Sequence, residues 1–559
     1  MLSVIVILLG IILYAIAYWT YIKWFDKNVI MSDPKRETPA HTYMDGVEFF
    51  PSNKYVLFGF QWKSIAALGP VVGPITAIQW GWLPGLLWII FGTIFIGWIH
   101  DYGSLMVSAR SEGASFGPIT YELISPRART ILLWYILWYI VLILSSFTNV
   151  VAGLFQSFPV SPVPVLIVTI VGMLAGYMTY KLKVNIVYTT VIAVIIMFLG
   201  VWAGIALPYV APLPAKGPFP NALDFWMFIT LLFCFLGAVL PIWVFIQPIN
   251  YLSFYLVYAG VIGIILGAFI GAPNYQFPMT TAFYDPAITA TGPLWPMMFV
   301  TIACGAISGW HSLIGSSISS KQLDTEPDAH FIGGGAMLAE GILALVALTT
   351  VAILSPDAVK GVAAAGRFVL GGSTLLGYLG ISTDVGKAFT SVMLIILAIT
   401  IMHIGLRITR LVLSDLAGPR FGGIFKNMYV SAILVCIVTY LITSPHVGAV
   451  FGYIWGTFGG ANQLMAGLAL MIVSLWLTRE KRPTVYTLIP MLFMLVTTLS
   501  ALAYLSYSGI TGYIGDPTKI GALIAAAVNV FLLILGLYMC YEGAKAFQRL
   551  RAKPKEKSA

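Results

Sequence analysis

Charge is what this sequence has least of. Only 9% of its 559 residues are Asp, Glu, Lys or Arg, whereas 59% are hydrophobic and the mean hydropathy is +0.92. Soluble chains carry about 25% charged residues, so the composition excludes a soluble globular protein. Apolar windows recur along nearly the whole length and leave no stretch for a soluble domain of useful size.

Cysteine is also scarce, and no secretory cleavage signal is present. The four cysteines Cys234, Cys304, Cys436 and Cys540 lie far apart in apolar windows without CxxC spacing, which argues against disulfides and zinc ribbons. The first apolar window has no basic residue ahead of it and no small-residue cleavage pattern behind it. We therefore expect it to be a retained first span.

The apolar windows and the breaker residues between them predict an all-α polytopic membrane protein. We expect about fifteen spans, near residues 2–24, 55–78, 82–109, 130–156, 162–180, 184–208, 223–247, 251–271, 293–318, 331–355, 387–414, 427–443, 447–478, 486–508 and 519–544. In domain terms this is one transmembrane unit over residues 1–545, with a peripheral first span (1–24) and a basic cytoplasmic tail (546–559).

The placement of Lys and Arg predicts the orientation. If the loops alternate sides, 24 basic residues fall on one side, five on the other, and Lys63 inside a span. Cytoplasmic loops carry the excess of Lys and Arg, so we expect the N-terminus outside and the C-terminus in the cytoplasm of a plasma membrane. The net charge of +9 then reflects topology rather than nucleic acid as a partner, and the partners expected are the lipid bilayer and a small molecule.

Two spans contain residues that interrupt a helix. The second span carries Gly69-Pro70 and Gly73-Pro74 in its middle or outer half, and proline removes a backbone donor and clashes with the preceding turn. The ninth span is rich in glycine and serine, which can also serve close helix packing. Non-helical backbone inside a bilayer survives only when buried in protein or lining a cavity. A pair of interrupted spans in the two halves of a chain indicates an inverted-repeat secondary transporter.

Ionisable residues fall at one depth in these and neighbouring spans. At about 1.5 Å per residue, they lie roughly 10–17 Å from the cytoplasmic end, near the middle of a core about 30 Å thick. They are Lys63, His100, Asp101, His311, Glu340 and His403. Such residues are costly in lipid and usually face a cavity or one another.

Each of these residues has a structural and a functional interpretation. Lys63 and Glu340 can form a purely structural ion pair; alternatively, Lys63 receives a substrate carboxylate while Glu340 carries a proton. Asp101 can pair with Arg110 at the cytoplasmic end, and His403 can be a histidine satisfied by hydrogen bonds.

Long motifs resemble the carbon-starvation protein A (CstA) family. They are KYVLFGFQWKSIAALGPVVGPITAIQWGWLPGLLW, IHDYGSLMVSARSEGASFG, FVTIACGAISGWHSLIGSSISSKQLDTEPDAHFIGGGAMLAEG, FGGANQLMAGLALMIVSLWL and PMLFMLVTTLSAL. They spread from roughly residue 40 to residue 505, with residues 55–505 as the family core. The resemblance implies a LeuT-like inverted-repeat core with broken helices and additional spans. It also implies uptake of peptides or pyruvate, coupled to protons or, as the second choice, sodium.

The motifs carry candidate site residues with them. The expected substrate-binding residues are Lys63, Gly69, Pro70, Gly73, Gly305, Ser308, Gly309, Asn462 and Gln463. The expected coupling residues are Glu340, His311 and Asp101, and the expected inner-gate residues are Lys321, Glu326 and Asp328.

The chain also departs from the family pattern. It has Phe60 and Gln61 where the family pattern has histidines, and Lys63 where the pattern has a small apolar residue. Ile249 and Asn250 replace an Arg and an Asp together. These departures bear on the shared substrate and coupling ion, and the role of Lys63 is not inherited from the family.

A transporter is thus expected rather than an enzyme, because no GxSxG or HExxH pattern is present. No cofactor is expected. The alternative is a membrane redox protein on a transporter-like fold, with haem or a metal ion held by His100, His311 and His403, since histidines on different helices can supply axial haem ligands. A nutrient sensor that binds without transporting is a further alternative, and the sequence does not specify the oligomeric state.

Overall fold

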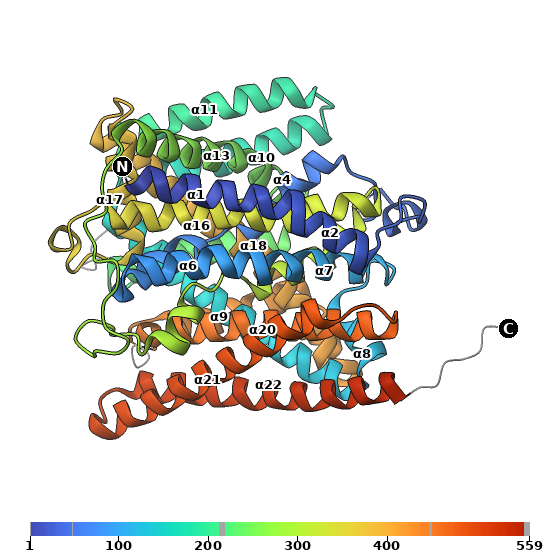
Figure 1. Ribbon diagram of the computed structural model, residues 1–559. Coiled ribbons are helices and arrows are strands. Elements are labelled where there is room, and N and C mark those ends of the chain that lie inside the picture. Colours follow the sequence, from blue (N-terminus) through green and yellow to red (C-terminus); the bar gives the residue numbers. More distant parts are fainter. Residues whose placement is uncertain (1, 47, 212–218, 447–449, 553–559) are drawn as a thin grey trace.

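The computed structural model describes residues 2–46, 48–211, 219–446 and 450–552, and its regular structure in these ranges is helical. The long helices run in a common direction across the view, with α11 at one edge and α21 and α22 at the other (Figure 1). They are α1 (Leu2–Ala17), α6 (Trp82–Gly92), α7 (Trp98–Ala109), α9 (Pro126–Ser157), α10 (Pro162–Tyr180), α11 (Ile186–Ala206), α12 (Ala222–Val239), α13 (Ile246–Gly271), α16 (Ala336–Ala352), α18 (Thr383–Phe425), α19 (Met428–Thr443), α20 (Phe451–Arg479), α21 (Val485–Gly515) and α22 (Ile520–Ala552).

Shorter helices join or interrupt these rods. α1 continues through π-helical turns and α2 (Lys23–Phe25) to Ile30, and α6 and α7 are joined by a π-helical turn, so each forms one long rod. The short elements are α3 (Pro39–Thr42), α4 (Lys54–Ile65), α5 (Gly69–Ala77), α8 (Phe116–Leu123), α14 (Phe299–Thr301), α15 (Gly309–Ser317) and α17 (Ala364–Gly377).

The described residues form twelve helices long and apolar enough to cross a membrane, or thirteen if the bent pair α4–α5 is one span. The predicted number of about fifteen is therefore not confirmed. Helices lie in all fifteen predicted windows, but the ninth window is split into short pieces, and the twelfth holds only the 16 residues of α19. Composition identifies these windows, but it does not show that the second, ninth and twelfth hold helices too short to span alone.

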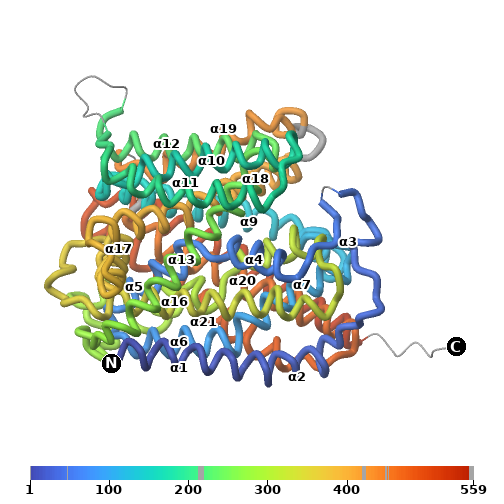
Figure 2. The backbone as a smooth tube through the Cα atoms, turned by 90° about the horizontal axis from the view of Figure 1, so that it is seen from above, coloured from blue at the N-terminus to red at the C-terminus, as the bar shows by residue number. Residues whose placement is uncertain are grey.

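Burial separates a central group of helices from a peripheral one. The most apolar window of α20 is 100% buried and that of α18 is 94% buried, against 33% for α10, α11 and the first rod. Figure 2 shows α1 at the outer edge and α20 well inside. Small residues let helices pack this closely, and α20 carries Gly459, Gly460, Ala461 and Gly467 on its buried length. The interrupted helices pack against this central group.

The predicted basic tail is partly helical. α22 continues to Ala552, so the first seven residues of the expected tail extend the last rod. The rest of that tail, residues 553–559, lies outside the described residues.

Candidate functional site: a polar core between two broken helices

The first break separates α4 from α5. The helix stops at Ile65, residues 66–68 are not helical, and the two halves are bent by 48°. The break lies just before the Gly-Pro pairs rather than at them, which corrects the predicted position. Pro70 occupies the first turn of α5, where its missing N–H would have no helical partner, and only Pro74 lies inside the helix.

The second break is longer and lies between α14 and α15. Residues 302–308 are not helical, and Ser308 has extended backbone (φ −143°, ψ 132°) immediately before α15 begins at Gly309. Gln463 on α20 donates from Nε2 to the carbonyls of Phe299 (2.8 Å) and Ile302 (3.2 Å). Thr93 donates to the carbonyl of Gly305 at 3.2 Å. Side chains therefore supply the partners that hydrocarbon cannot give to unwound backbone.

The two breaks meet in space. The indole Nε1 of Trp310, in the first turn of α15, donates to the carbonyl of Ser64 in the last turn of α4 at 2.8 Å. A Cβ added to Gly73 of α5 would lie only 2.7 Å from the carbonyl oxygen of Thr301, so this crossing admits only glycine. The sequence prediction of two interrupted spans is confirmed, and the structure adds that they touch.

Asn462 on α20 organises the second break. Its Oδ1 accepts from the hydroxyls of Tyr139 (2.5 Å) and Ser308 (3.1 Å), and its Nδ2 donates to Sγ of Cys304 at 3.2 Å. Gly309 lets this helix come close, because a Cβ there would lie 2.5 Å from the Asn462 carbonyl oxygen. Asn462 and Gln463 thus hold the turn at 302–308 in place, and Tyr139 is a participant that the motifs do not indicate.

Four titratable side chains form a continuous buried chain across α7, α15 and α16. His100 Nδ1 lies 2.7 Å from Oδ1 of Asp101, whose Oδ2 lies 2.9 Å from Nδ1 of His311. Nε2 of His311 lies 2.9 Å from Oε2 of Glu340. All four side chains are fully buried. We call His100, Asp101, His311 and Glu340 the relay.

Both ends of the relay carry unsatisfied atoms. The His311–Glu340 contact has the distance of an ion pair, but its geometry is not that of a hydrogen bond, and neither carboxylate oxygen of Glu340 has a hydrogen-bond partner. At the other end, Nε2 of His100 and the hydroxyl of Ser104, one turn further along α7, are also unpartnered. A buried chain of titratable groups whose end atoms lack hydrogen-bond partners is suited to accept and release a proton.

Two pairings that the sequence left open as structural alternatives are not formed. Glu340 lies against His311, and Lys63 donates to the hydroxyl of Thr400 on α18 at 2.6 Å, so these two residues form no ion pair. Asp101 belongs to the relay, whereas Arg110 donates two bonds to Glu326. The predicted layer of ionisable groups is therefore divided into the relay and a separate group around Lys63.

His403 is not satisfied as expected. Its imidazole stacks on Phe233 (centroids 5.7 Å apart, planes at 15°), and neither ring nitrogen has a hydrogen-bond partner. It is not among the hydrogen-bond partners of the Asp101 carboxylate, which are His100 and His311. Among the residues the structure describes, no group of three or more His, Cys, Asp or Glu side chains has a geometry that could hold a metal ion.

The predicted gate residues are paired, but with other segments rather than with one another. Lys321 lies 2.7 Å from Glu48, and Asp328 lies 3.6 Å from Lys54. Glu326 accepts from Nε and a terminal nitrogen of Arg110 at 2.9 and 2.7 Å. Burial lowers the pKa of Arg110, but the hydrogen bond and charge of Glu326 outweigh this effect and raise the pKa above its usual value.

Backbone contacts join the same two segments. The amide of Ser52 donates to the carbonyl of Gln322 at 3.0 Å, and Ser52 and Leu323 form an isolated parallel bridge. We call the contacts between residues 36–54 and 321–328, with Arg110, the clasp. It joins the chain leading into α4 to the chain leaving α15, at the end of the molecule that the sequence predicts to be cytoplasmic.

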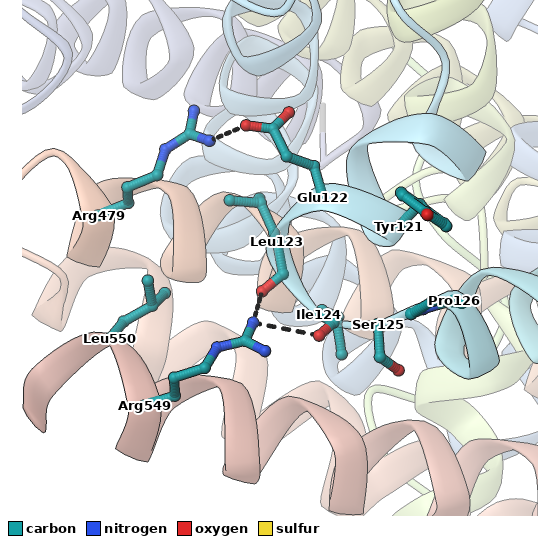
Figure 3. Close-up of a pocket in the computed structure, with 9 residues that line it drawn as sticks. All are labelled: Tyr121, Glu122, Leu123, Ile124, Ser125, Pro126, Arg479, Arg549 and Leu550. Atoms are coloured by element: carbon teal, nitrogen blue, oxygen red, sulfur yellow. Dashed lines mark hydrogen bonds and ion pairs between the residues drawn. The ribbon is translucent and has the colours of Figure 1, made fainter. Parts of the chain in front are cut away.

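A surface cavity of about 490 Å³ lies apart from this core, where α8, α9, α20 and α22 meet. Figure 3 shows Arg479 directed at Glu122, and Arg549 directed at the carbonyls of Leu123 and Ile124. None of the predicted site residues lines it. Both arginines already have partners within the protein.

The fold and the polar core define a class: a helical protein that crosses a membrane many times, with interrupted helices around buried titratable groups. The family model for carbon starvation protein CstA matches residues 2–374 and 358–501. The chain therefore belongs to the CstA family, as its motifs indicate.

Three relatives illustrate the range of the family. The Escherichia coli K12 protein named peptide transporter CstA is 30% identical over 572 residues, which cover 89% of this chain and 80% of that protein. The Bacillus subtilis 168 protein of the same name is 28% identical, covering 99% of this chain and 98% of its own length. The Escherichia coli K12 pyruvate/proton symporter BtsT is 34% identical over 358 residues, which cover 63% of this chain and 49% of that protein.

Solved structures show a more distant likeness. A manganese transporter from Eremococcus coleocola aligns with 88% of this chain and 94% of its own at 13% identity, with a TM-score of 0.48. MhsT, solved with L-phenylalanine, aligns with 85% of this chain and 98% of its own at 15% identity, with a TM-score of 0.47.

Proposed function

We propose that this protein is a secondary active transporter that takes up a small nutrient, a peptide or a pyruvate-like carboxylate, coupled to protons. The observation that carries the proposal is the relay, because it lies beside the second break and extends from α7 through the first turn of α15 to α16. The names of the relatives support transport of such solutes. The two touching breaks, one in each half of the chain, support a LeuT-like inverted-repeat architecture.

The relay has the charge balance needed to exchange one proton. His311 lies between two carboxylates, Asp101 and Glu340, and a buried medium strongly disfavours unbalanced charge. A protonated His311 neutralises Asp101, which leaves Glu340 as the group that gains or loses the proton. Because His311 lies in the first turn beyond the break, a change in the break moves the cation that stabilises the Glu340 carboxylate.

Under the proposal, the clasp indicates which side of the membrane is closed in this conformation. Its ion pairs close the end at which Lys321, Glu326 and Asp328 lie, and the positive-inside pattern supports a cytoplasmic position for that end. The conformation is then closed to the cytoplasm. Opening requires the segments 36–54 and 321–328 to part.

The experiment is uptake of labelled pyruvate and dialanine into proteoliposomes, driven in separate arms by a pH gradient and by a sodium gradient at equal pH. We expect accumulation in the pH arm. Glu340→Gln should abolish accumulation while retaining exchange of labelled for unlabelled substrate, because exchange needs no net proton transfer. Thr498→Val, which removes a buried hydroxyl bonded only within α21, is the matched control.

Three results would contradict the proposal. If folded protein accumulates neither compound, it does not transport these substrates. Accumulation only in the sodium arm would show that the coupling ion is sodium rather than the proton. If Glu340→Gln accumulates substrate in the pH arm as well as wild type does, the relay does not couple proton movement to transport.

A further inference from the structure

The amine of Lys63 is buried without a counter-ion. Its side chain is 2% exposed, and its hydrogen-bond partner is the hydroxyl of Thr400 at 2.6 Å. An ammonium has three N–H donors, and among the ion pairs of the described residues none includes Lys63. The residue lies in the last turn of α4, two positions before its final residue Ile65, where the helix dipole partly stabilises a cation.

A second group with unused hydrogen-bonding capacity lies one turn from Thr400 on α18. His403 is fully buried, and both of its ring nitrogens lack partners. Residues three apart on a helix share a face, so the imidazole lies on the same side of α18 as the Thr400 hydroxyl that holds the Lys63 amine. Leaving such a group unpaired costs about 1–3 kcal/mol. Packing alone therefore does not explain a histidine at this position.

The surroundings of His403 restrict what can bind there. Phe233 stacks on the imidazole, and the ring of Phe245 lies 6.0 Å away. α13 packs against both α4 and α18, and it carries Asn250, which is 6% exposed and whose two amide atoms have no partner. The two carboxylates of the membrane core, Asp101 and Glu340, are engaged with His311. Arg407, one turn beyond His403, donates to the carbonyls of Gly237 and Leu240, which leaves the Lys63 amine as the charge with unused donors. The site therefore offers positive charge, neutral donors and apolar walls.

We infer that Lys63 and His403 form a subsite that binds the carboxylate of the substrate, with Thr400 as a positioning residue. A single carboxylate neutralises the Lys63 ammonium and accepts hydrogen bonds from it and from one N–H of the imidazole. Thr400 donates its own proton to the carbonyl of Ile396 at 2.6 Å, so its oxygen holds the amine in place. This inference rests on the proposed transport function and separates the substrate's charge from the proton held by the relay.

The test compares each carboxylate with the matching carboxamide in the same proteoliposomes. The probes are pyruvate against pyruvamide, and dialanine against dialanine amide, each as a competitor of labelled uptake. We expect the carboxylates to compete roughly ten- to hundredfold better than the amides, the range for losing a hydrogen bond to a charged group. The pair that shows this discrimination identifies whether the carboxylate comes from a keto acid or from a peptide terminus.

Variants then assign the discrimination to the residues. Lys63→Met should abolish the preference for the carboxylate while leaving competition by the amide within about twofold of wild type, and Lys63→Arg should retain the preference. Thr400→Val should reduce the preference partly and raise KM with little change in kcat. His403→Leu should also reduce the preference for the carboxylate. The control Thr498→Val should change neither this preference nor KM.

Distinct failures separate this inference from the proposed function. If no probe is transported, the proposed function fails. If labelled substrate is transported but amides compete as well as carboxylates in the wild type, the carboxylate subsite is refuted, and this measurement needs no variant to fold. If discrimination persists in Lys63→Met, the carboxylate binds elsewhere.

Discussion

The pair of Arg110 and Glu326 gives the sharpest quantitative prediction. Their side chains are only 3% and 2% exposed, and the guanidinium donates two bonds to the carboxylate at 2.9 and 2.7 Å. Arg110 also donates to the carbonyls of Ile30 (3.1 Å) and Met31 (2.8 Å). Arg110→Ala therefore removes the ion pair of the buried Glu326 carboxylate, which keeps the Asp33 N–H at 2.8 Å as a hydrogen-bond donor, and it removes the side-chain donor of both carbonyls.

The expected loss of stability from Arg110→Ala is about 3–5 kcal/mol, the range for removing one partner of a buried ion pair. The lower end applies here, because Arg36 lies 3.8 Å from Glu326 and is half exposed, so it can move closer. In the double variant with Glu326→Gln, the loss should be much smaller than the sum of the two single losses, since no buried charge remains.

The assay is thermal unfolding of the detergent-solubilised protein, compared across the four members of this double-mutant cycle. Arg479→Ala is the matched control, because its pair with Glu122 is 32% and 62% exposed and such surface pairs contribute about 0–1 kcal/mol. The reasoning is refuted if Arg110→Ala unfolds no earlier than Arg479→Ala, or if the two losses simply add.

Further predictions concern the breaks and the clasp. A disulfide between Ser52→Cys and Leu323→Cys, which form a bridge, should stop uptake until a reductant is added; uptake by the oxidised protein would show that the clasp need not open. Gly73→Ala should abolish uptake, because its Cβ would lie 2.7 Å from a backbone oxygen, whereas Gly153→Ala, with open space around it, should behave as wild type in the same assay. Gln463→Leu leaves the carbonyl of Ile302 unpaired, whereas that of Phe299 keeps the indole N–H of Trp88 at 3.2 Å, and it should lower stability by about 1–3 kcal/mol; an unchanged melting temperature would mean that another group takes its place.

The sequence predicts the helices and the breaks well, because both follow from local chemistry. Long apolar windows form helices, and Gly-Pro pairs or glycine-serine runs mark where they are interrupted, as just before Gly69-Pro70 and at residues 302–308. The position of the first break is wrong by a few residues, because proline is tolerated in the first turn of a new helix.

The partners of the buried charges could not be predicted in the same way. Depth along a helix follows from counting residues, but the direction in which a side chain points requires a polar face, and these helices are apolar on nearly all sides. Glu340 and Lys63 share a depth and yet contact His311 and Thr400 on different helices. Likewise, the sequence assigns Lys321, Glu326 and Asp328 to one side of the membrane but does not indicate Glu48, Arg110 and Lys54 as their partners.

The two breaks differ in how much slack they give the polypeptide. Three residues, 66–68, separate α4 from α5, whereas seven residues, 302–308, separate α14 from α15. We expect α4 and α5 to tilt as two rigid helices about the short segment 66–68. The longer segment 302–308 between α14 and α15 should instead change conformation along its whole length. Amide hydrogen exchange should then be fastest at 302–308 once Gln463 is replaced, and equal protection of both breaks would speak against this division of labour.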